Sequence, residues 1–263
     1  MTQSLIYYIP APILGVLVAI GAVAVTVPGV LMRRRFALHE KDDFVAILLG
    51  TMGAVYAVLL SFVLVAVWEN FEHAALTAET EASYLVVLRR NAETLGPEAR
   101  QEIEMLTREY AQAVVQKEWP AMGRGEGSPE VTKVESMLFA AHMKLSPSTD
   151  TQKTVYTQSV RRLDELNELR LRRLFAARTG LHPAIWCVLL IGALVTMTCA
   201  FFLNSESPKG QICLTSLLAT VIGLILFVIL ALDYPFTGDV IIEPEAFQVL
   251  MGTPGAAGQS ALR

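Results

Sequence analysis

The chain has 263 residues, of which 53% are hydrophobic and 17% are charged. This apolar share exceeds the roughly 45–50% of soluble domains and indicates a membrane protein. The formal net charge is −4, and no basic face large enough to make nucleic acid the main partner is visible.

Four long runs of the sequence contain no charged residue: Tyr7–Met32, Phe44–Trp68, Pro183–Asn204 and Gly210–Leu232. Each is long enough to cross a bilayer as a helix, which takes about 20 residues. The block from Glu69 to Gly180, by contrast, holds 15 Lys or Arg and 17 Asp or Glu. We therefore expect a first helix pair (1–68), an extramembrane domain (69–180), a second helix pair (181–232) and a C-terminal tail (233–263).

The first two runs predict helices of different extent. No Lys or Arg precedes Arg33, and the first run is too long for the apolar part of a signal peptide, so we expect a retained span. After the second run, Gly96 is the first glycine or proline, and the apolar 3–4 spacing continues. This pattern predicts one very long helix that leaves the membrane and enters the domain.

The rest of the domain has the signals of an all-helical bundle. Pro97 is suited to the first turn of a helix, and residues 123–129 form a break rich in glycine. We expect a shorter helix at about 130–145 and a long one from about 148–150 to Arg178. No alternation typical of strands is visible. The segment from Gly252 to Arg263 has the composition of a disordered tail.

The charge pattern leaves open which side of the membrane the domain faces. The two short loops carry five basic residues: Arg33, Arg34, Arg35, Lys41 and Lys209. The positive-inside rule then places these loops in the cytoplasm and the domain outside. Six arginines precede the third span and favour the opposite orientation: Arg161, Arg162, Arg170, Arg172, Arg173 and Arg178.

The sequence contains no recognisable catalytic constellation. It has no Walker loop, no His-Glu-x-x-His, no Gly-x-Ser-x-Gly and no Cys-x-x-Cys, and its four histidines are scattered. We therefore expect neither an enzyme nor a cofactor. The predicted spans also lack the ionisable residues that proton-coupled transporters place in mid-membrane. If the protein conducts ions, an oligomer must build the pore around a shared axis.

The second span offers the best candidate for a pore lining. One helical face combines mostly apolar side chains with a carboxylate at its end: Thr51, Val55, Val58, Phe62, Val65 and Glu69. In a ring of subunits this face would form an apolar constriction, which can gate by dewetting, with carboxylates at its mouth. The alternative is that the face packs against other spans.

The arginine run near the third span also has two interpretations. Arg170, Arg172 and Arg173 would suit anionic lipid headgroups. They would equally suit ion pairs with Glu165, Glu168 or the acidic first helix of the domain.

Several motifs resemble the bestrophin-like domain family of bacterial membrane proteins. They are Tyr56-Ala57-Val58-Leu59-Leu60-Ser61-Phe62 with Trp68-Glu69, Glu81-Ala82, Tyr110, Glu118-Trp119-Pro120, Arg172-Arg173-Leu174, Pro183, Trp186, Leu232-Asp233-Tyr234-Pro235-Phe236 and Gly238-Asp239. The resemblance implies an all-α membrane protein with four transmembrane helices and a helical-bundle domain between spans two and three. It also implies a multi-pass location, in the inner membrane of a bacterium.

The resemblance extends distantly to bestrophins, which are pentameric ion channels with a cytoplasmic domain. Bestrophins bind calcium through a dense acidic cluster after the last span. This chain departs from that pattern and has only Asp239, Glu243 and Glu245 there as candidate calcium ligands.

Two functions from different classes are consistent with these features. The first is a homo-oligomeric, pentameric ion channel with the second span lining the pore; its partners would be copies of itself, membrane lipids and permeant ions. The second is a membrane-anchored interaction or scaffold module without transport activity. The number of subunits separates the two, because only a ring encloses a central path.

Overall fold

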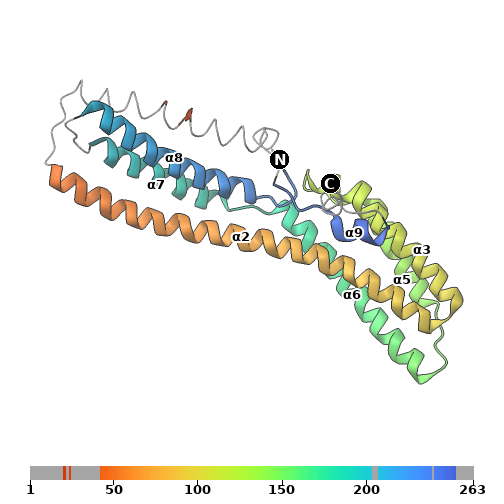
Figure 1. The fold of residues 1–263 in the computed structure, drawn as a ribbon. Helices are drawn as coiled ribbons and strands as arrows, with labels where there is room; N and C mark the ends of the chain where they lie inside the picture. The colour runs from red at the N-terminus through yellow and green to blue at the C-terminus, as the bar shows by residue number, and fades with distance from the viewer. Residues whose placement is uncertain (1–19, 22–23, 25–41, 203–206, 239, 253–263) are drawn as a thin grey trace. The chain divides into compact units, whose positions relative to one another are not determined.

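The structure is a computed structural model that describes residues 20–21, 24, 42–202, 207–238 and 240–252 (Figure 1). Within these ranges the chain is helical and contains no strand. Apart from residues 20, 21 and 24, the predicted first span lies outside the described residues, as do residues 33–41 of the loop after it and residues 253–263 of the predicted disordered tail. The fold class is therefore confirmed as all-α, and among the described residues three helices are long and apolar enough to cross a membrane.

The helices follow the predicted order closely. They are α2 (Asp42–Leu95), α3 (Pro97–Ala113), the π-helical η2 (Val114–Glu118), α4 (Trp119–Met122), α5 (Pro129–Met143), α6 (Asp150–Arg178), α7 (Pro183–Phe202), α8 (Pro208–Leu232) and α9 (Glu245–Leu250). The long helix that continues past the second span is confirmed, because α2 has 54 residues. The π turn and α9 were not predicted.

The described chain divides into two compact units. The membrane unit comprises the chain up to Glu69, Gly180–Asp233 and Gly238–Val240, and the domain unit comprises Asn70–Thr179, Tyr234–Thr237 and the chain from Ile241. The first half of α2, with α7 and α8, belongs to the membrane unit. The second half of α2 belongs to the domain unit with α3, η2, α4, α5, α6 and α9.

In the membrane unit, α2 packs on α7 through Tyr56. The Tyr56 hydroxyl donates a hydrogen bond to the Leu189 carbonyl at 3.0 Å, and the side chain is buried. A Cβ atom on Gly192 would lie 2.5 Å from the Tyr56 ring. Glycine at this position is therefore what allows the edge of the ring to approach α7 this closely.

The ends of α7 and α8 are joined by one carboxylate of the membrane unit. Asp233 accepts hydrogen bonds from the Leu181 N–H at 2.6 Å and from the Trp186 indole N–H at 3.4 Å. The Leu181 N–H lies just before the first turn of α7 and has no hydrogen-bond acceptor within the helix, so the Asp233 carboxylate supplies one.

In the domain unit, local signals set the helix ends and buried apolar side chains fill the core. Gly96 joins α2 to α3 with a φ of 124°, a conformation that favours glycine. Thr149 and Gln152 form a capping box at the start of α6. The core includes Leu85, Ile103 and Leu138, each less than 2% exposed.

The segment after α8 packs against Trp119 within the domain unit. The Trp119 indole N–H donates to the Ile242 carbonyl at 2.9 Å. Phe236 and Phe247 meet the indole edge-on, with ring centroids 5.5 and 5.8 Å away. Trp119 is therefore buried, with only 9% of its surface exposed.

Candidate functional site

The six predicted pore-lining residues lie on a face of α2 that the described chain leaves uncovered. Val55, Val58, Phe62 and Val65 are 65%, 56%, 73% and 53% exposed, and Thr51 and Glu69 are also exposed. The Thr51 hydroxyl donates to the Ile47 carbonyl of its own helix at 2.9 Å.

The packing face of α2 lies opposite. Its buried residues are Tyr56, Leu60, Val63 and Val67. Each lies two positions before or after an exposed residue of the predicted lining, which is a rotation of about 200° around an α-helix. The membrane half of α2 therefore has one face for its own subunit and a second, largely apolar face without a partner among the described residues.

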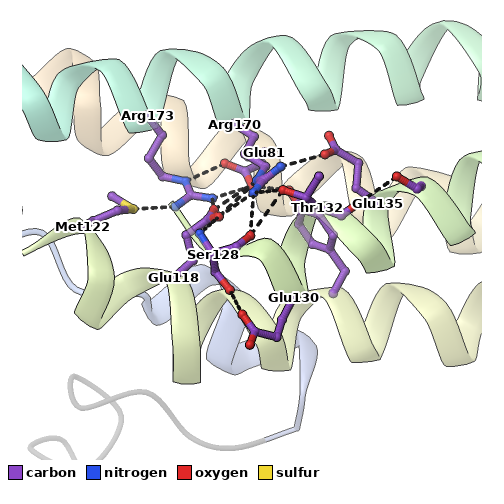
Figure 2. Close-up of polar contacts among 11 residues, drawn as sticks. Glu81, Glu118, Met122, Ser128, Glu130, Thr132, Glu135, Arg170 and Arg173 are labelled. Carbon is purple, nitrogen blue, oxygen red and sulfur yellow. Dashed lines mark hydrogen bonds and ion pairs between the residues drawn. The ribbon is translucent and has the colours of Figure 1, made fainter. Parts of the chain in front are cut away.

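A second candidate site lies inside the domain unit, where charged side chains from several helices meet (Figure 2). This buried charge cluster consists of Glu81 on α2, Tyr110 on α3, Glu118 on η2, Glu135 on α5, and Arg170 and Arg173 on α6. Glu81, Tyr110, Glu118 and Arg173 are fully buried.

Arg173 is the centre of the buried charge cluster. Its Nε and Nη2 atoms donate to the two carboxylate oxygens of Glu81 at 2.7 and 2.9 Å, and Nη2 also donates to Glu118 at 2.9 Å. The guanidinium carbon lies 5.2 Å from the Trp119 ring centroid. The Tyr110 hydroxyl donates to Glu81 at 2.8 Å. This combination of bidentate pairing and aromatic stacking is specific to arginine.

Arg170, about one turn earlier on α6, also binds Glu118 and adds Glu135 as a second carboxylate partner. It donates to Glu118 at 2.6 Å, to Glu135 at 2.7 Å and to the Thr132 hydroxyl at 3.0 Å. Glu118 also accepts the Ser128 backbone N–H at 3.0 Å. Figure 2 shows that both guanidinium groups point toward Glu118. Glu118 is therefore shared by both arginines.

The charges within the cluster determine which groups ionise. Burial disfavours the charged form of Glu118, but the hydrogen bond from Arg170 and the charge of Arg173 outweigh it, so its pKa lies below the ordinary value. Burial raises the pKa of Glu135, although Arg170 opposes the shift. Burial and the Glu81 charge raise the pKa of Tyr110, which keeps it a hydrogen-bond donor.

The predicted arginine group is divided by the fold. Arg170 and Arg173 are buried in the cluster, whereas Arg172 is exposed and pairs with Glu168 at 2.6 Å. Of the predicted calcium residues, Asp239 lies outside the described residues, Glu243 is exposed and Glu245 is partly buried. In the part of the chain that the structure describes, no group of three or more His, Cys, Asp or Glu could hold a metal ion.

The sequence did not identify the buried charge cluster as a site. Glu81, Tyr110, Glu118 and Arg173 belong to the motifs that carry the family resemblance, yet they are far apart in the chain. The available signal was that three of these four motif positions are charged residues in helices that must contribute to one core. A helix pattern by itself does not show which charged residue of one helix meets which residue of another.

The family is established by a direct comparison. The profile of the family described as Bestrophin-like domain matches residues 15–247. The chain belongs to the Bestrophin-like family. A comparison with curated proteins finds no match.

Solved structures share the fold of this Bestrophin-like chain at low sequence identity. A bacterial bestrophin homologue from Klebsiella pneumoniae, crystallised with one substitution, aligns with a TM-score of 0.68 at 12% identity, over 95% of this chain and 99% of its own. Another substituted form of that homologue gives a TM-score of 0.64 at 14% identity, over 89% and 99%. A crystal structure described only as a membrane protein gives 0.68 at 12% identity, over 91% and 99%.

Removing Arg173 tests the buried charge cluster. We expect Arg173→Leu to lower the free energy of unfolding by about 3–5 kcal/mol, because it leaves the buried Glu81 carboxylate without an arginine partner and Glu118 with Arg170 alone. The measurement is denaturation of the full chain in detergent, monitored by circular dichroism. Arg172→Leu is the matched control, and as a change to an exposed pair it should cost no more than about 0.5 kcal/mol. Equal losses in the two variants would contradict the prediction.

We expect the protein to lose stability in mild acid because of the buried side chain of His142 on α5. The side chain is fully buried, its Nδ1 lies 2.8 Å from the Leu138 carbonyl oxygen, and its Nε2 has no partner among the described residues. Burial lowers its pKa, although the Leu138 hydrogen bond and Glu102 oppose the shift. The unfolded chain therefore binds the proton more readily, and stability falls as the pH drops below about 6.5.

The test compares thermal denaturation midpoints between neutral and mildly acidic pH. We expect His142→Leu to reduce the fall of the midpoint. His73→Leu, at an exposed position, should retain it. A pH profile of His142→Leu that matches that of the unmodified protein would exclude His142 as the source.

Proposed function

We propose that the chain is a subunit of a homo-oligomeric, pentameric ion channel whose pore is lined by the exposed face of α2. The proposal rests on one observation, which is that the membrane half of α2 has a buried face and, opposite to it, an exposed apolar face. Tyr56 and its neighbours bury one face against the same subunit, while Val55, Val58 and Phe62 remain uncovered on the other. The family, the membrane-spanning helices and the resemblance to bestrophin channels support the same function.

The chemistry of this face suits a gated pore. A ring of Phe62 and valine side chains would give a narrow apolar constriction, which water leaves readily and which therefore blocks hydrated ions when it is closed. Glu69, at the end of the face, would add a ring of negative charge at the mouth. Thr51 bonds to its own helix backbone, so its hydroxyl donor would not be directed into the pore.

Variants of the face should change conduction. We expect Phe62→Ala to widen the constriction and raise unitary conductance or open probability severalfold, and Glu69→Gln to weaken the preference for cations over anions. Currents are measured in planar bilayers with purified protein. The control is Leu194→Ala on α7, because Leu194 is similarly exposed at 67% but lies outside the proposed lining. Unchanged currents in both α2 variants would count against this lining.

The number of subunits tests the assembly itself. We expect native mass spectrometry of protein in mild detergent to give a pentamer, because a pore along a shared axis requires a ring. A monomer or dimer would contradict the channel. It would instead favour the second hypothesis, a membrane-anchored interaction or scaffold module without transport activity.

Four further features remain predictions from the sequence. These are calcium binding at Asp239, Glu243 and Glu245, lipid contact at the exposed Arg172, the side on which the domain lies and the inner membrane of a bacterium as the location.

A further inference from the structure

A pocket in the domain unit lies between the second half of α2 and the chain around α9. Its volume is about 540 Å³, within the range of sites for small molecules. Its lining includes Phe71, Ala75, Ala78 and Glu79 on α2, and Glu243 and Glu245 on the opposite wall. We call this cavity the acid-rimmed pocket.

The fold brings the two walls of the acid-rimmed pocket together by specific bonds. One wall is α2, with Glu79. The other begins at Ile242, whose carbonyl accepts from Trp119 at 2.9 Å and whose N–H donates to the Pro235 carbonyl at 2.9 Å. The carboxylates of Glu243 and Glu245 thereby line the same cavity as Glu79, although they are distant in the sequence.

The ionisable groups of the pocket all have the same sign. The lining contains three glutamates and no lysine, arginine or histidine. Glu79 and Glu243 are exposed, and neither forms an ion pair among the described residues. The other lining side chains are apolar or aromatic, with a partly buried ring at Phe71. The pocket thus combines negative potential with an apolar floor.

A ligand that matches these features carries a positive charge on an apolar body. A bare metal ion is a poor match, because it needs several converging oxygen ligands, and within the described ranges no such group of carboxylates exists. An alkylammonium group gains from the carboxylates by long-range attraction and from the aromatic ring by a cation–π contact. Its alkyl part covers the alanine side chains of α2.

We propose that the acid-rimmed pocket binds small organic monocations of the alkylammonium class. The proposal does not depend on the pore, because every lining residue belongs to the domain unit and lies outside the proposed lining face of α2.

The test uses choline as the probe and 3,3-dimethylbutan-1-ol as its neutral isostere, in which carbon replaces the charged nitrogen. Isothermal titration of the full chain in detergent should show choline binding. The affinity for the neutral isostere should be lower by about tenfold or more. Added salt should weaken choline binding, because the carboxylates are exposed. Equal binding of the two compounds, or no binding of choline at millimolar concentrations, would overturn the proposal.

Variants locate the binding. The double variant Glu79→Gln/Glu243→Gln keeps the shape of both side chains and removes their charge, and we expect it to weaken choline binding by about tenfold. Glu109→Gln, at an exposed carboxylate of α3 outside the pocket, is the matched control and should bind choline like the unmodified protein. An equal loss in the control variant would show a nonspecific effect of net charge and would also overturn the proposal.

Discussion

The Arg173 guanidinium lies wholly out of water, so the protein itself must provide every hydrogen bond and counter-charge that water would supply. Glu81 and Glu118 do so from two different segments, and Tyr110 occupies a remaining position on Glu81. A slip of one helical turn along any of these helices is about 5.4 Å, which is far longer than a hydrogen bond. Any such slip would leave a buried charge without a partner. We infer that the cluster sets the register of the bundle more than it adds to stability.

The sequence predicts the helices well because their signals are local. Runs without charge mark the membrane helices, the stretch without glycine after Trp68 marks the continuation of α2, and Pro97 marks the start of α3. The corresponding helices begin and end within about two residues of expectation. The buried charge cluster could not be predicted in this way, because it depends on how the helices are rotated against one another. Whether Arg173 or Arg172 turns inward depends on the rotation of α6 against its neighbours, and adjacent positions differ by about 100°.

The exposed face of α2 shows how far the sequence specifies a site. Its six positions were identified from the 3–4 spacing, and the same spacing defines the opposite packing face through Tyr56. Both faces are apolar, so composition alone does not indicate which one the subunit buries. Gly192 makes the difference, because only its missing side chain lets the Tyr56 ring approach α7.

The π turn η2 carries one more consequence. Buried apolar side chains larger than alanine recur in this part of the chain at Ile103, Leu106, Tyr110 and Val114, and then after an interval of five at Trp119. The Trp119 backbone N–H accordingly donates to the Val114 carbonyl, five residues earlier. A chain shorter by one residue here would regain an ordinary α-helical phase and rotate the indole by about 100°. The count of residues between Val114 and Trp119, more than their chemical identity, therefore determines whether the C-terminal segment has an indole to bind.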